Sequence, residues 1–592
     1  MLKKDVAEPQ LPAEQIARSE QTSTKPHISA TRMMLLGTLA FILCVLITVA
    51  PLHRLAGTTL LLQLQIGMLL AQVGTWLPSS LALATRPRAA FISTNSVEFL
   101  LLMALAFGIY GFCAWFLQRH ASQNENHPIL RLIWLGAIAA GLIFVVTPTM
   151  LSHDIFVYAG YGRLMAAHQA NPYFVTLTHF PQDPFNASDD WKAATSAYGP
   201  IWLVVCSLVG FVLGTQALWY IIVFRLFALA AHLVNTFLVT STLRTMGKPS
   251  RTVLAGTLLY AWNPLALLES GMGGHNDTFM VTFVLLGILL AARAERRDRL
   301  TSPRGYLPAI IAFTLATLVK FTAAPLIVLF LLMLAYRALR PKFSVNTTGT
   351  IGTTGTTDTI DTTDTTQPRR TMLRWVPALK VTLIATGVST VVGLIWYGPF
   401  WIGHSISEIV GSFSSPPSSR FSQNSIMRAM VNWNSAHTLP VHTWMHALVY
   451  LLSLHQLWSV VNFVTLAITL AIGAFWLWRS PTTTTLICSI LLILGALLIV
   501  TPWFFSWYVV WLVGLAAVCF SSENNRIERA LIVSALTFSA SAFLTYLFRG
   551  YPPFGSWVGF TVLATIGPPL LVLLIFMLKR SYKHELATGL AQ

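Results

Sequence analysis

Long apolar runs, each close to the length of a membrane-crossing helix, recur along this 592-residue chain and alternate with short polar segments. A helix needs ~20 apolar residues to cross the hydrocarbon core of a bilayer. Residues 198–241 are continuously apolar and predict one or two such helices, whereas 59–78 contain glutamines and are interpreted as interfacial or re-entrant. Further spans are predicted at 33–51, 97–117, 130–149, 252–269, 274–292, 305–319, 322–340, 375–396, 457–478, 484–501, 504–520, 527–548 and 555–578. The pattern therefore predicts an all-α polytopic membrane protein with a bundle of about 13–15 transmembrane helices.

Basic residues in the short loops predict which ends of these helices face the cytoplasm. Lys and Arg gather in 292–300, 337–342, 478–480, 524–530 and 578–584, as expected for cytoplasmic loops. Alternation along the chain then places 150–197, 269–274, Lys320 and 397–455 on the opposite, outer face. The basic segment 243–251 should also be cytoplasmic, which requires an odd number of crossings between 198 and 241. Two apparent helices there would give an even number, and an interfacial position for one of them is left open.

The same pattern suggests how the chain is organised. A Thr-rich, low-complexity stretch interrupts the apolar sequence and cannot bury enough apolar surface to fold by itself. The expected units are a cytoplasmic tail at 1–32, a transmembrane catalytic module at 33–340 that includes the outer loop 150–197, a Thr-rich cytoplasmic loop at 341–373, a second transmembrane module at 374–580 that includes the outer loop 397–455, and a cytoplasmic tail at 581–592.

Composition narrows the class of protein further. Hydrophobic residues make up 55% of the chain, and the formal net charge is +17. Nucleic acid is a poor explanation for this charge, because the basic residues lie beside apolar runs in short loops. The five cysteines all fall inside apolar runs, which indicates neither a disulfide framework nor a metal-binding spacing.

The first candidate site follows an apolar run at the start of the loop 150–197. In a helix that begins near Ser152, Asp154, Tyr158 and Tyr161 lie on one face, and Arg163 follows in a chain with few charges. One interpretation is a general base beside a substrate-contacting wall. Another is a helix cap at Asp154 with the tyrosines in the aromatic belt of the membrane. The pattern alone favours neither.

The second cluster surrounds a glycine-rich turn between two apolar helices. Glu269 ends the first helix, and His275, Asn276 and Asp277 open the next. Ionisable residues are costly within apolar hairpins and tend to mark function. Helix capping would explain Asn276 or Asp277 but not Glu269 and His275 in the same turn, so a functional site is favoured, and these four residues are predicted to contact the substrate. A divalent-metal site from His275, Asp277 and Glu269 stays open, although no tight ligand spacing supports it.

Positive charges and aromatic residues on the same predicted face complete the candidate site. Lys320 lies midway along a double-length apolar run, which makes it the outer tip of a hairpin. It either extends to the headgroups or contacts an anion such as a lipid phosphate. Arg420 and Arg428 in the outer loop and Tyr508 in an aromatic segment are predicted substrate contacts. Such a combination of carboxylates, cations and aromatic side chains would bind a substrate with a phosphate, a sugar and a lipid tail.

Several segments, in this order, resemble the glycosyltransferase C superfamily and, within it, the actinobacterial-type polyprenyl-phosphomannose-dependent α-mannosyltransferases. They are "DIFVYAGYGRLMAAHQANPY" (154–173), "SAYGPIWLVV" (196–205), "WNPLALLESGMGGHNDTFM" (262–280), "LVKFTAAPL" (318–326) and "PWFFSWYVVW" (502–511). The resemblance implies a glycosyltransferase C-type helical bundle with its active site on the outer face. It also implies Asp154 as the base, a matching turn at His275, Asn276 and Asp277, and a matching Lys320. The extra N-terminal apolar segments and the Thr-rich insertion depart from the family pattern and leave the acceptor undefined.

The resemblance implies an inverting transfer of a sugar, most simply mannose, from a polyprenyl-phosphate donor to a glycan or glycolipid acceptor of the cell envelope. It implies membrane lipid as surroundings and a multi-pass location in a bacterial plasma membrane. No cofactor is certain, and a divalent metal stays possible. The alternative is a transporter or flippase of a lipid-linked sugar. Transporters commonly contain repeats with polar groups near the bilayer midplane. This chain has no clear repeat, and its polar clusters lie at one face, which favours the enzyme.

Overall fold

The computed structural model describes residues 29–56, 88–121, 126–147, 150–340, 375–414, 422–436, 443–521, 525–548 and 558–589. Within these ranges the regular secondary structure is helical, and the one β-type contact is an isolated bridge between Gln423 and Trp503. The predicted segment 59–78, the Thr-rich loop 341–373 and Arg420 lie outside the described residues. The predicted all-helical class is confirmed.

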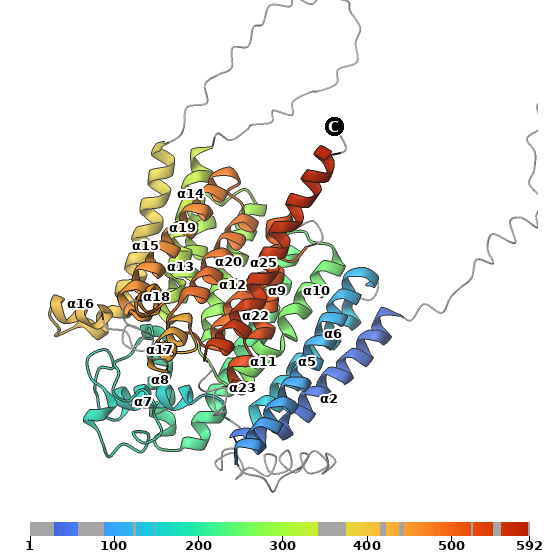
Figure 1. Ribbon diagram of the computed structural model, residues 1–592. Helices are drawn as coiled ribbons and strands as arrows, with labels where there is room; N and C mark the ends of the chain where they lie inside the picture. The colour runs from blue at the N-terminus through green and yellow to red at the C-terminus, as the bar shows by residue number, and fades with distance from the viewer. Residues whose placement is uncertain are drawn as a thin grey trace, which may run out of the picture.

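The helices differ in length, and the long ones form the body of the bundle (Figure 1). The helices with 16 or more residues are α2 (Ala30–Ala56), α5 (Arg88–His120), α6 (Asn126–Val146), α9 (Ala217–Thr245), α12 (Asp277–Arg296), α13 (Pro303–Val319), α14 (Ala324–Leu339), α15 (Trp375–Trp401), α19 (His455–Arg479), α20 (Thr483–Val500), α22 (Arg526–Ser541) and α25 (Val558–Gly589). The shorter elements are α7 (Asp154–Ala166), η2 (Leu177–His179), α8 (Pro200–Leu213), α10 (Ser250–Ala261), α11 (Pro264–Gly271), η3 (Phe321–Ala323), α16 (Ile406–Ser414), α17 (Ile426–Ala436), α18 (Trp444–Ser453), η5 (Ser506–Val509), α21 (Val510–Cys519) and α23 (Leu544–Phe548).

The described helices have the length and composition of a multi-pass membrane protein. Ten of them contain a sufficiently long apolar window to cross a bilayer, and five shorter apolar helices of 10–17 residues accompany them. Large apolar side chains are exposed along their outer surfaces, for example Ile395 on α15 (66%) and Phe463 on α19 (72%). A water-soluble protein rarely exposes so much contiguous apolar surface, whereas a bilayer solvates it.

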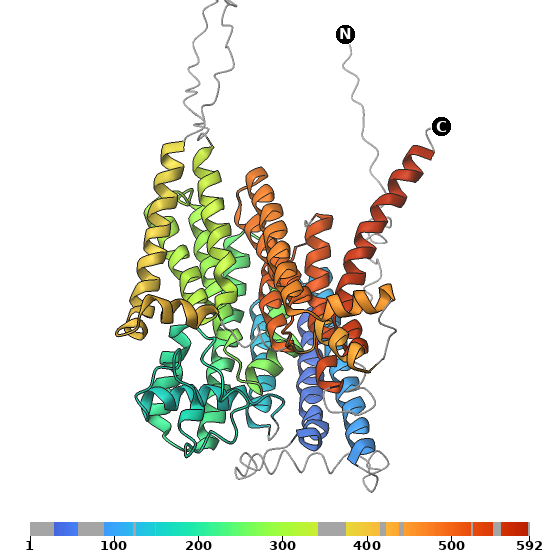
Figure 2. The ribbon, with the colours of Figure 1, turned by 60° about the vertical axis from the view of Figure 1, so that its left-hand side comes forward.

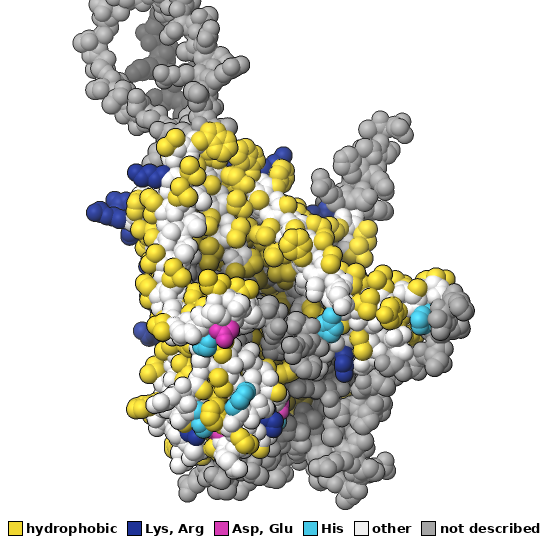
Figure 3. Space-filling model, turned by 90° about the vertical axis from the view of Figure 1, so that its left-hand side faces the viewer, with side chains coloured by type: hydrophobic (Ala, Val, Ile, Leu, Met, Phe, Trp, Pro, Cys, Tyr) yellow, Lys and Arg dark blue, Asp and Glu magenta, His cyan; other side chains and the backbone are white. Residues whose placement is uncertain are grey.

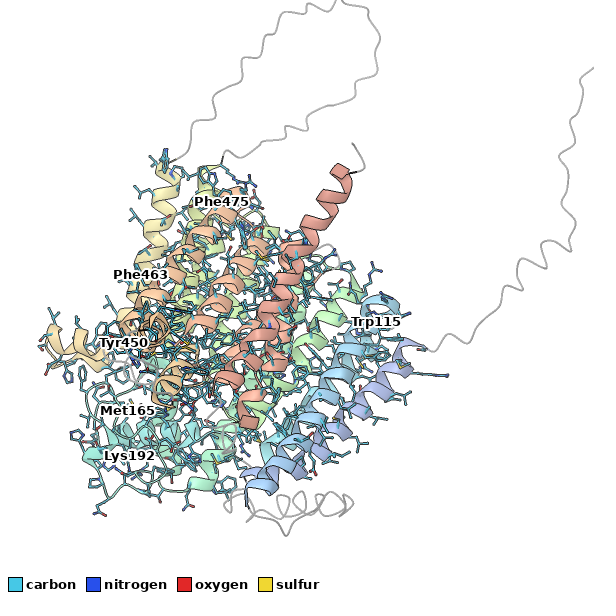
Figure 4. All side chains as sticks on the ribbon, in the orientation of Figure 1. Trp115, Met165, Lys192, Tyr450, Phe463 and Phe475 are labelled. Carbon is cyan, nitrogen blue, oxygen red and sulfur yellow. The ribbon has the colours of Figure 1, made fainter. Side chains whose placement is uncertain are left out.

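The types of side chain on the outer surface also differ between the two ends of the bundle. On the face shown in Figure 3, apolar side chains cover the upper half, and Asp, Glu and His side chains lie only over the lower half. Figure 4 places Phe463 and Phe475 of α19 in the upper part of the molecule and Lys192 in the lower part. The segment between α6 and α9 belongs to this lower part and lies below α14 and α15 in Figure 2.

Three of the five basic loops predicted to be cytoplasmic, 292–300, 337–342 and 478–480, come together at one end of the bundle. Arg337 Nη1 donates to Glu295 Oε1 at 3.2 Å, Arg340 donates to the carbonyl oxygens of Trp478 and Arg479, and the backbone N–H of Thr483 donates to Glu295 Oε2 at 2.8 Å. Figure 1 shows the end of α14 and the start of α15 at this upper end. The hairpin turn at Lys320 lies at the other end of α13 and α14, as the basic-loop pattern predicts.

Two helical details were open or wrong in the sequence analysis. Residues 198–241 form the short helix α8 and the longer helix α9, and α9 is the one long enough to cross a bilayer, which gives the odd number of crossings that 243–251 requires. The single span predicted over 252–269 is instead broken into α10 and α11. Pro264 cannot donate a helical hydrogen bond, and the side chain of Asn263 accepts from the N–H of Ala266 at 3.0 Å, which starts a new helix there.

Glycines allow α7 and α8 to pack closely, and this packing positions the start of α7. A Cβ atom on Gly162 would lie 2.2 Å from the carbonyl oxygen of Cys206, and one on Gly210 would lie 2.8 Å from the carbonyl carbon of Gly162. Both distances are far shorter than a van der Waals contact, and both involve backbone that cannot turn aside. Any side chain at these positions must therefore push the two helices apart.

We expect Gly162→Ala to destabilise the protein by ~1–3 kcal/mol, the usual cost of overpacking a well-packed contact. The measurement is the thermal unfolding midpoint of the purified protein in detergent. Gly393→Ala in α15 is the matched control, because nothing lies within 4 Å of a Cβ there. Equal midpoints for the two variants would show that α7 and α8 do not depend on this close approach.

Candidate active site

Segments that are far apart in the sequence meet around one cavity at the lower end of the bundle. The cavity has a volume of about 480 Å³, and its lining includes Asp154, Tyr161, Tyr198, Lys320, Trp507 and Tyr508. These residues come from the start of α7, the segment before α8, the turn between α13 and α14, and the segment that contains η5. The turn between α11 and α12 lies directly behind it.

Asp154, His275 and Glu269 form a line that leads from the cavity into the protein. Asp154 Oδ2 lies 3.5 Å from His275 Nδ1, and His275 Nε2 lies 3.3 Å from Glu269 Oε2. The side chain of Asp154 is 14% exposed, whereas those of His275 and Glu269 are 1% and 2% exposed. Both contacts are ion-pair contacts that lack the alignment of good hydrogen bonds. Only the carboxylate of Asp154 can therefore reach a molecule in the cavity.

Buried neighbours fix the inner end of this line. Glu269 Oε1 accepts hydrogen bonds from Ser506 Oγ at 3.0 Å and from the Tyr546 hydroxyl at 2.7 Å. The imidazole ring of His275 stacks on Trp507, with 4.0 Å between ring centroids and 15° between planes. Burial of a carboxylate is costly unless hydrogen bonds or a counter-charge compensate. The two hydroxyls and the histidine supply that compensation for Glu269.

The charges in this line determine its protonation. Burial lowers the pKa of His275, but Asp154 and Glu269 on either side more than offset this and raise it to about 9. Burial raises the pKa of Asp154, but the nearby His275, with a contribution from the charge of Lys320, holds it below its usual value. At neutral pH these shifts favour an imidazolium at His275 beside an ionised Asp154. An ionised carboxylate that opens into a cavity can accept a proton from a bound hydroxyl.

Asp277 and Lys320 form a second ion pair on the other side of the same turn. Lys320 Nζ donates to Asp277 Oδ1 at 2.7 Å, and Trp511 Nε1 donates to the same oxygen at 2.6 Å. The ammonium group also lies 4.4 Å from the centroid of the Tyr508 ring, within reach of a cation–π interaction. The side chain of Lys320 keeps 12% exposure, whereas that of Asp277 keeps 1%. Lys320 is thus the member of this pair that can meet a ligand.

An apolar groove of about 550 Å³ adjoins the cavity and shares Lys320 with it. The groove lies between α14, α19 and α20, and its apolar lining includes Val328, Leu466 and Leu494. Phe321 and Tyr508 also line both spaces. A single ammonium group therefore lies where a polar cavity meets an apolar groove along the spanning helices.

The structure brings most of the predicted site residues together. Asp154, Glu269, His275, Asp277, Lys320 and Tyr508 are connected as described, and Tyr161 lines the cavity. The Tyr158 hydroxyl is buried and donates to Asn276 Oδ1 at 3.4 Å, so both lie behind the cavity wall. Two residues lie elsewhere. Arg163 Nε donates to Asp183 Oδ2 at 2.7 Å, and Arg428 is exposed on α17 and lines neither space.

Sequence reasoning missed Ser506, Tyr546, Trp507 and Trp511, which are the direct partners of the predicted charged residues. Trp507 and Trp511 belong to the aromatic segment that contains the predicted contact Tyr508, and the polar Ser506 within it was the available signal. Tyr546 had no sequence signal, because it lies 277 positions from Glu269 in the chain. A metal site from His275, Asp277 and Glu269 is not formed, since Asp277 turns to Lys320. No group of three or more His, Cys, Asp or Glu that could hold a metal occurs among the described residues.

Comparisons with known proteins relate the N-terminal part of the chain to one family. Residues 54–337 match the family described as alpha-(1->6)-mannopyranosyltransferase, N-terminal domain. The alpha-(1->6)-mannopyranosyltransferase A of Corynebacterium glutamicum is 23% identical over 170 residues, which are 27% of this chain. The matched region spans about a third, 31%, of that relative. No solved structure matches the chain.

Proposed function

We propose that this protein is a membrane mannosyltransferase that uses a polyprenyl-phosphate donor, because residues 54–337 match the family described as alpha-(1->6)-mannopyranosyltransferase, N-terminal domain. The acceptor is a hydroxyl of a glycan or glycolipid, and the reaction takes place on the face of a bacterial plasma membrane opposite the cytoplasm. The observation that carries the proposal is the position of Lys320, which borders both the polar cavity and the apolar groove.

The two adjoining spaces suit the two ends of such a donor. A polyprenyl chain is apolar and fits a groove lined by Val328, Leu466 and Leu494 along the spanning helices. Its phosphate then lies at the junction, where the Lys320 ammonium group supplies a point charge. The sugar extends into the cavity toward Asp154. Aromatic side chains around the cavity offer flat apolar faces for the sugar ring, while Asp154 and Lys320 offer polar contacts.

The reaction in this arrangement is a single displacement. The acceptor oxygen attacks the anomeric carbon of the mannosyl group, and the bond from that carbon to the phosphate oxygen breaks with its electron pair. The proton of the acceptor hydroxyl passes to Asp154, which acts as general base. Lys320 stabilises the negative charge that develops on the departing polyprenyl phosphate. Attack opposite the leaving group inverts the anomeric configuration.

The turn between α11 and α12 keeps the two charged groups apart. His275 contacts Asp154, whereas Asp277, two residues later, contacts Lys320. The base and the phosphate-binding cation therefore have separate counter-ions.

The test is an assay of the purified protein in lipid nanodiscs with labelled polyprenyl-phosphomannose and a panel of mannoside acceptors, followed by mass spectrometry of the products. We expect acceptors that are one hexose heavier, with the anomeric configuration opposite to that of the donor. GDP-mannose in place of the lipid donor is the control and should give no product. Label that crosses the membrane of sealed vesicles without a glycosylated product would instead indicate a lipid-linked sugar transporter.

A further inference from the structure

We propose that His275 and Glu269 are positioning residues for Asp154: they hold its carboxylate ionised and aimed into the cavity, so that the base keeps working as the surroundings become acidic. This inference rests on the proposed function. It differs from the expectation drawn from the sequence, which placed both residues in contact with substrate. Their side chains are 1% and 2% exposed, and neither lines the cavity.

The geometry indicates that His275 and Glu269 hold Asp154 in place and do not contact the substrate. His275 lies between the two carboxylates, 3.5 Å from Asp154 Oδ2 and 3.3 Å from Glu269 Oε2. Stacking on Trp507 fixes the plane of the ring. Asp154 Oδ1 accepts a hydrogen bond from Ser152 Oγ at 3.1 Å, just before the start of α7. Each carboxylate oxygen thus has one neighbour, His275 or Ser152, and the side chain also lines the cavity.

The backbone around His275 is built to place this ring. Gly274 adopts a φ of +64°, a left-handed conformation that glycine tolerates best. A Cβ atom on Gly273 would lie 2.5 Å from Cδ2 of His275, so the ring packs directly over that glycine. The backbone N–H of His275 donates to the carbonyl oxygen of Glu269 at 3.2 Å. The turn therefore fixes the imidazole and the glutamate relative to each other.

Electrostatics explain why the base would need this support. A carboxylate in a mostly apolar cavity tends to take up a proton, because burial disfavours its charged form. An imidazolium on its inner side opposes that tendency, and Glu269 keeps the imidazole protonated. Removal of either charge should raise the proton affinity of Asp154. Protonated Asp154 cannot accept a proton, so turnover should fail at a higher pH than in the unmodified protein.

Other titratable groups around Asp154 must be separated from this effect. Lys320 is the second cation that favours the ionised form of Asp154. Tyr158, Tyr161, Tyr198 and Tyr508 interact with its charge as neutral phenols. Burial raises the pKa of the neighbouring Asp189 to about 7, so Asp189 could produce a pH dependence of its own. The variant Asp189→Asn is therefore part of the test.

The first measurement is the pH dependence of turnover in nanodiscs for His275→Gln, Glu269→Gln and Asp189→Asn. We expect the acidic loss of activity to move upward by ~1–3 pH units in His275→Gln, and less in Glu269→Gln, because His275 still takes up a proton at low pH. His232→Gln is the matched control, since His232 is a buried, stacked histidine that lines neither the cavity nor the groove. Its pH profile should not move. A lower rate with an unmoved profile in His275→Gln, or a shift in Asp189→Asn alone, would overturn the proposal.

The second measurement does not depend on catalysis. Histidine labelled with ¹⁵N reports ring protonation by NMR, and the His275 signal is identified by its loss in His275→Gln. We expect His275 to titrate with a pKa of about 9 and to titrate lower in both Glu269→Gln and Asp154→Asn, with apparent values that belong to the coupled group. An ordinary titration near 6.5 contradicts the positioning role. A raised pKa in a protein without transferase activity would refute the proposed function and leave the ion-pair line intact.

Discussion

Asp154→Asn should lower turnover by ~10²–10⁴-fold, the usual contribution of a positioned general base, while the protein remains folded in the membrane. Asparagine keeps the shape of the side chain and can still contact Ser152 and His275. It cannot take up the proton that the hydroxyl of the glycan or glycolipid acceptor releases. The dissociation constant of the donor should change little, because we propose that the phosphate and the lipid chain bind elsewhere, at Lys320 and the apolar groove.

The measurement is the initial rate at saturating donor and acceptor, with thermal unfolding as a check on folding. Asp190→Asn is the matched control. Asp190 lies in the same outer segment, its side chain is 55% exposed, and it contacts His153 at the surface rather than the cavity. Its turnover should be near normal. If Asp154→Asn also retained near-normal turnover, Asp154 would not be the base.

Lys320→Ala should lower kcat/KM for the donor by ~10–100-fold, the scale of a lost hydrogen bond to a charged group. The apparent affinity for the acceptor should change much less. Lys320→Arg should be tolerated only in part, because a guanidinium fork is larger and aimed differently from an ammonium group. Initial rates at varied donor concentration, repeated at varied acceptor concentration, separate these effects.

The ion pair with Asp277 complicates the single variant. Removal of Lys320 leaves the buried carboxylate of Asp277 without its cation, a change that typically costs ~3–5 kcal/mol of stability. The double variant Lys320→Met/Asp277→Asn removes both charges and avoids this cost. Recovery of stability without recovery of donor use would assign the phosphate contact to Lys320. Normal donor use in the double variant would contradict this assignment. The control is Lys248→Ala, because Lys248 follows α9 and contacts Ser521, away from the residues that line the cavity and the groove.

The basic loops illustrate a sequence prediction that needed little tertiary information. Segments around 295, 337–340 and 478–483 were predicted to lie on one side, and the structure shows them in contact. Hydrophobic length fixes how far each helix can extend along the membrane normal, and charge bias fixes which end stays in the cytoplasm. Both rules act on local stretches of sequence, so the pattern alone was sufficient.

The arginines show where such reasoning stops. Arg163 and Arg428 lie on the predicted outer face, yet Arg163 pairs with the buried Asp183, which also contacts His168 at 2.8 Å. The pairing is a contact between residues 20 positions apart in an irregular segment. No periodicity indicates whether a charge on the correct face meets a substrate or another side chain. That choice depends on how the segment folds back on α7.

The sequence by itself determined the membrane-spanning helical class, the grouping of the acidic and basic residues near one face, and the identity of most charged residues in the site, because these follow from local hydrophobicity and from the high cost of placing charge in an apolar segment. Only the tertiary structure decided which charges pair. It placed His275 between Asp154 and Glu269, turned Asp277 toward Lys320, and brought Tyr546 and Ser506 to Glu269 from more than two hundred residues away. The physical reason is that an ion pair depends on distance in space, and here the close packing of helices from both halves of the chain sets that distance.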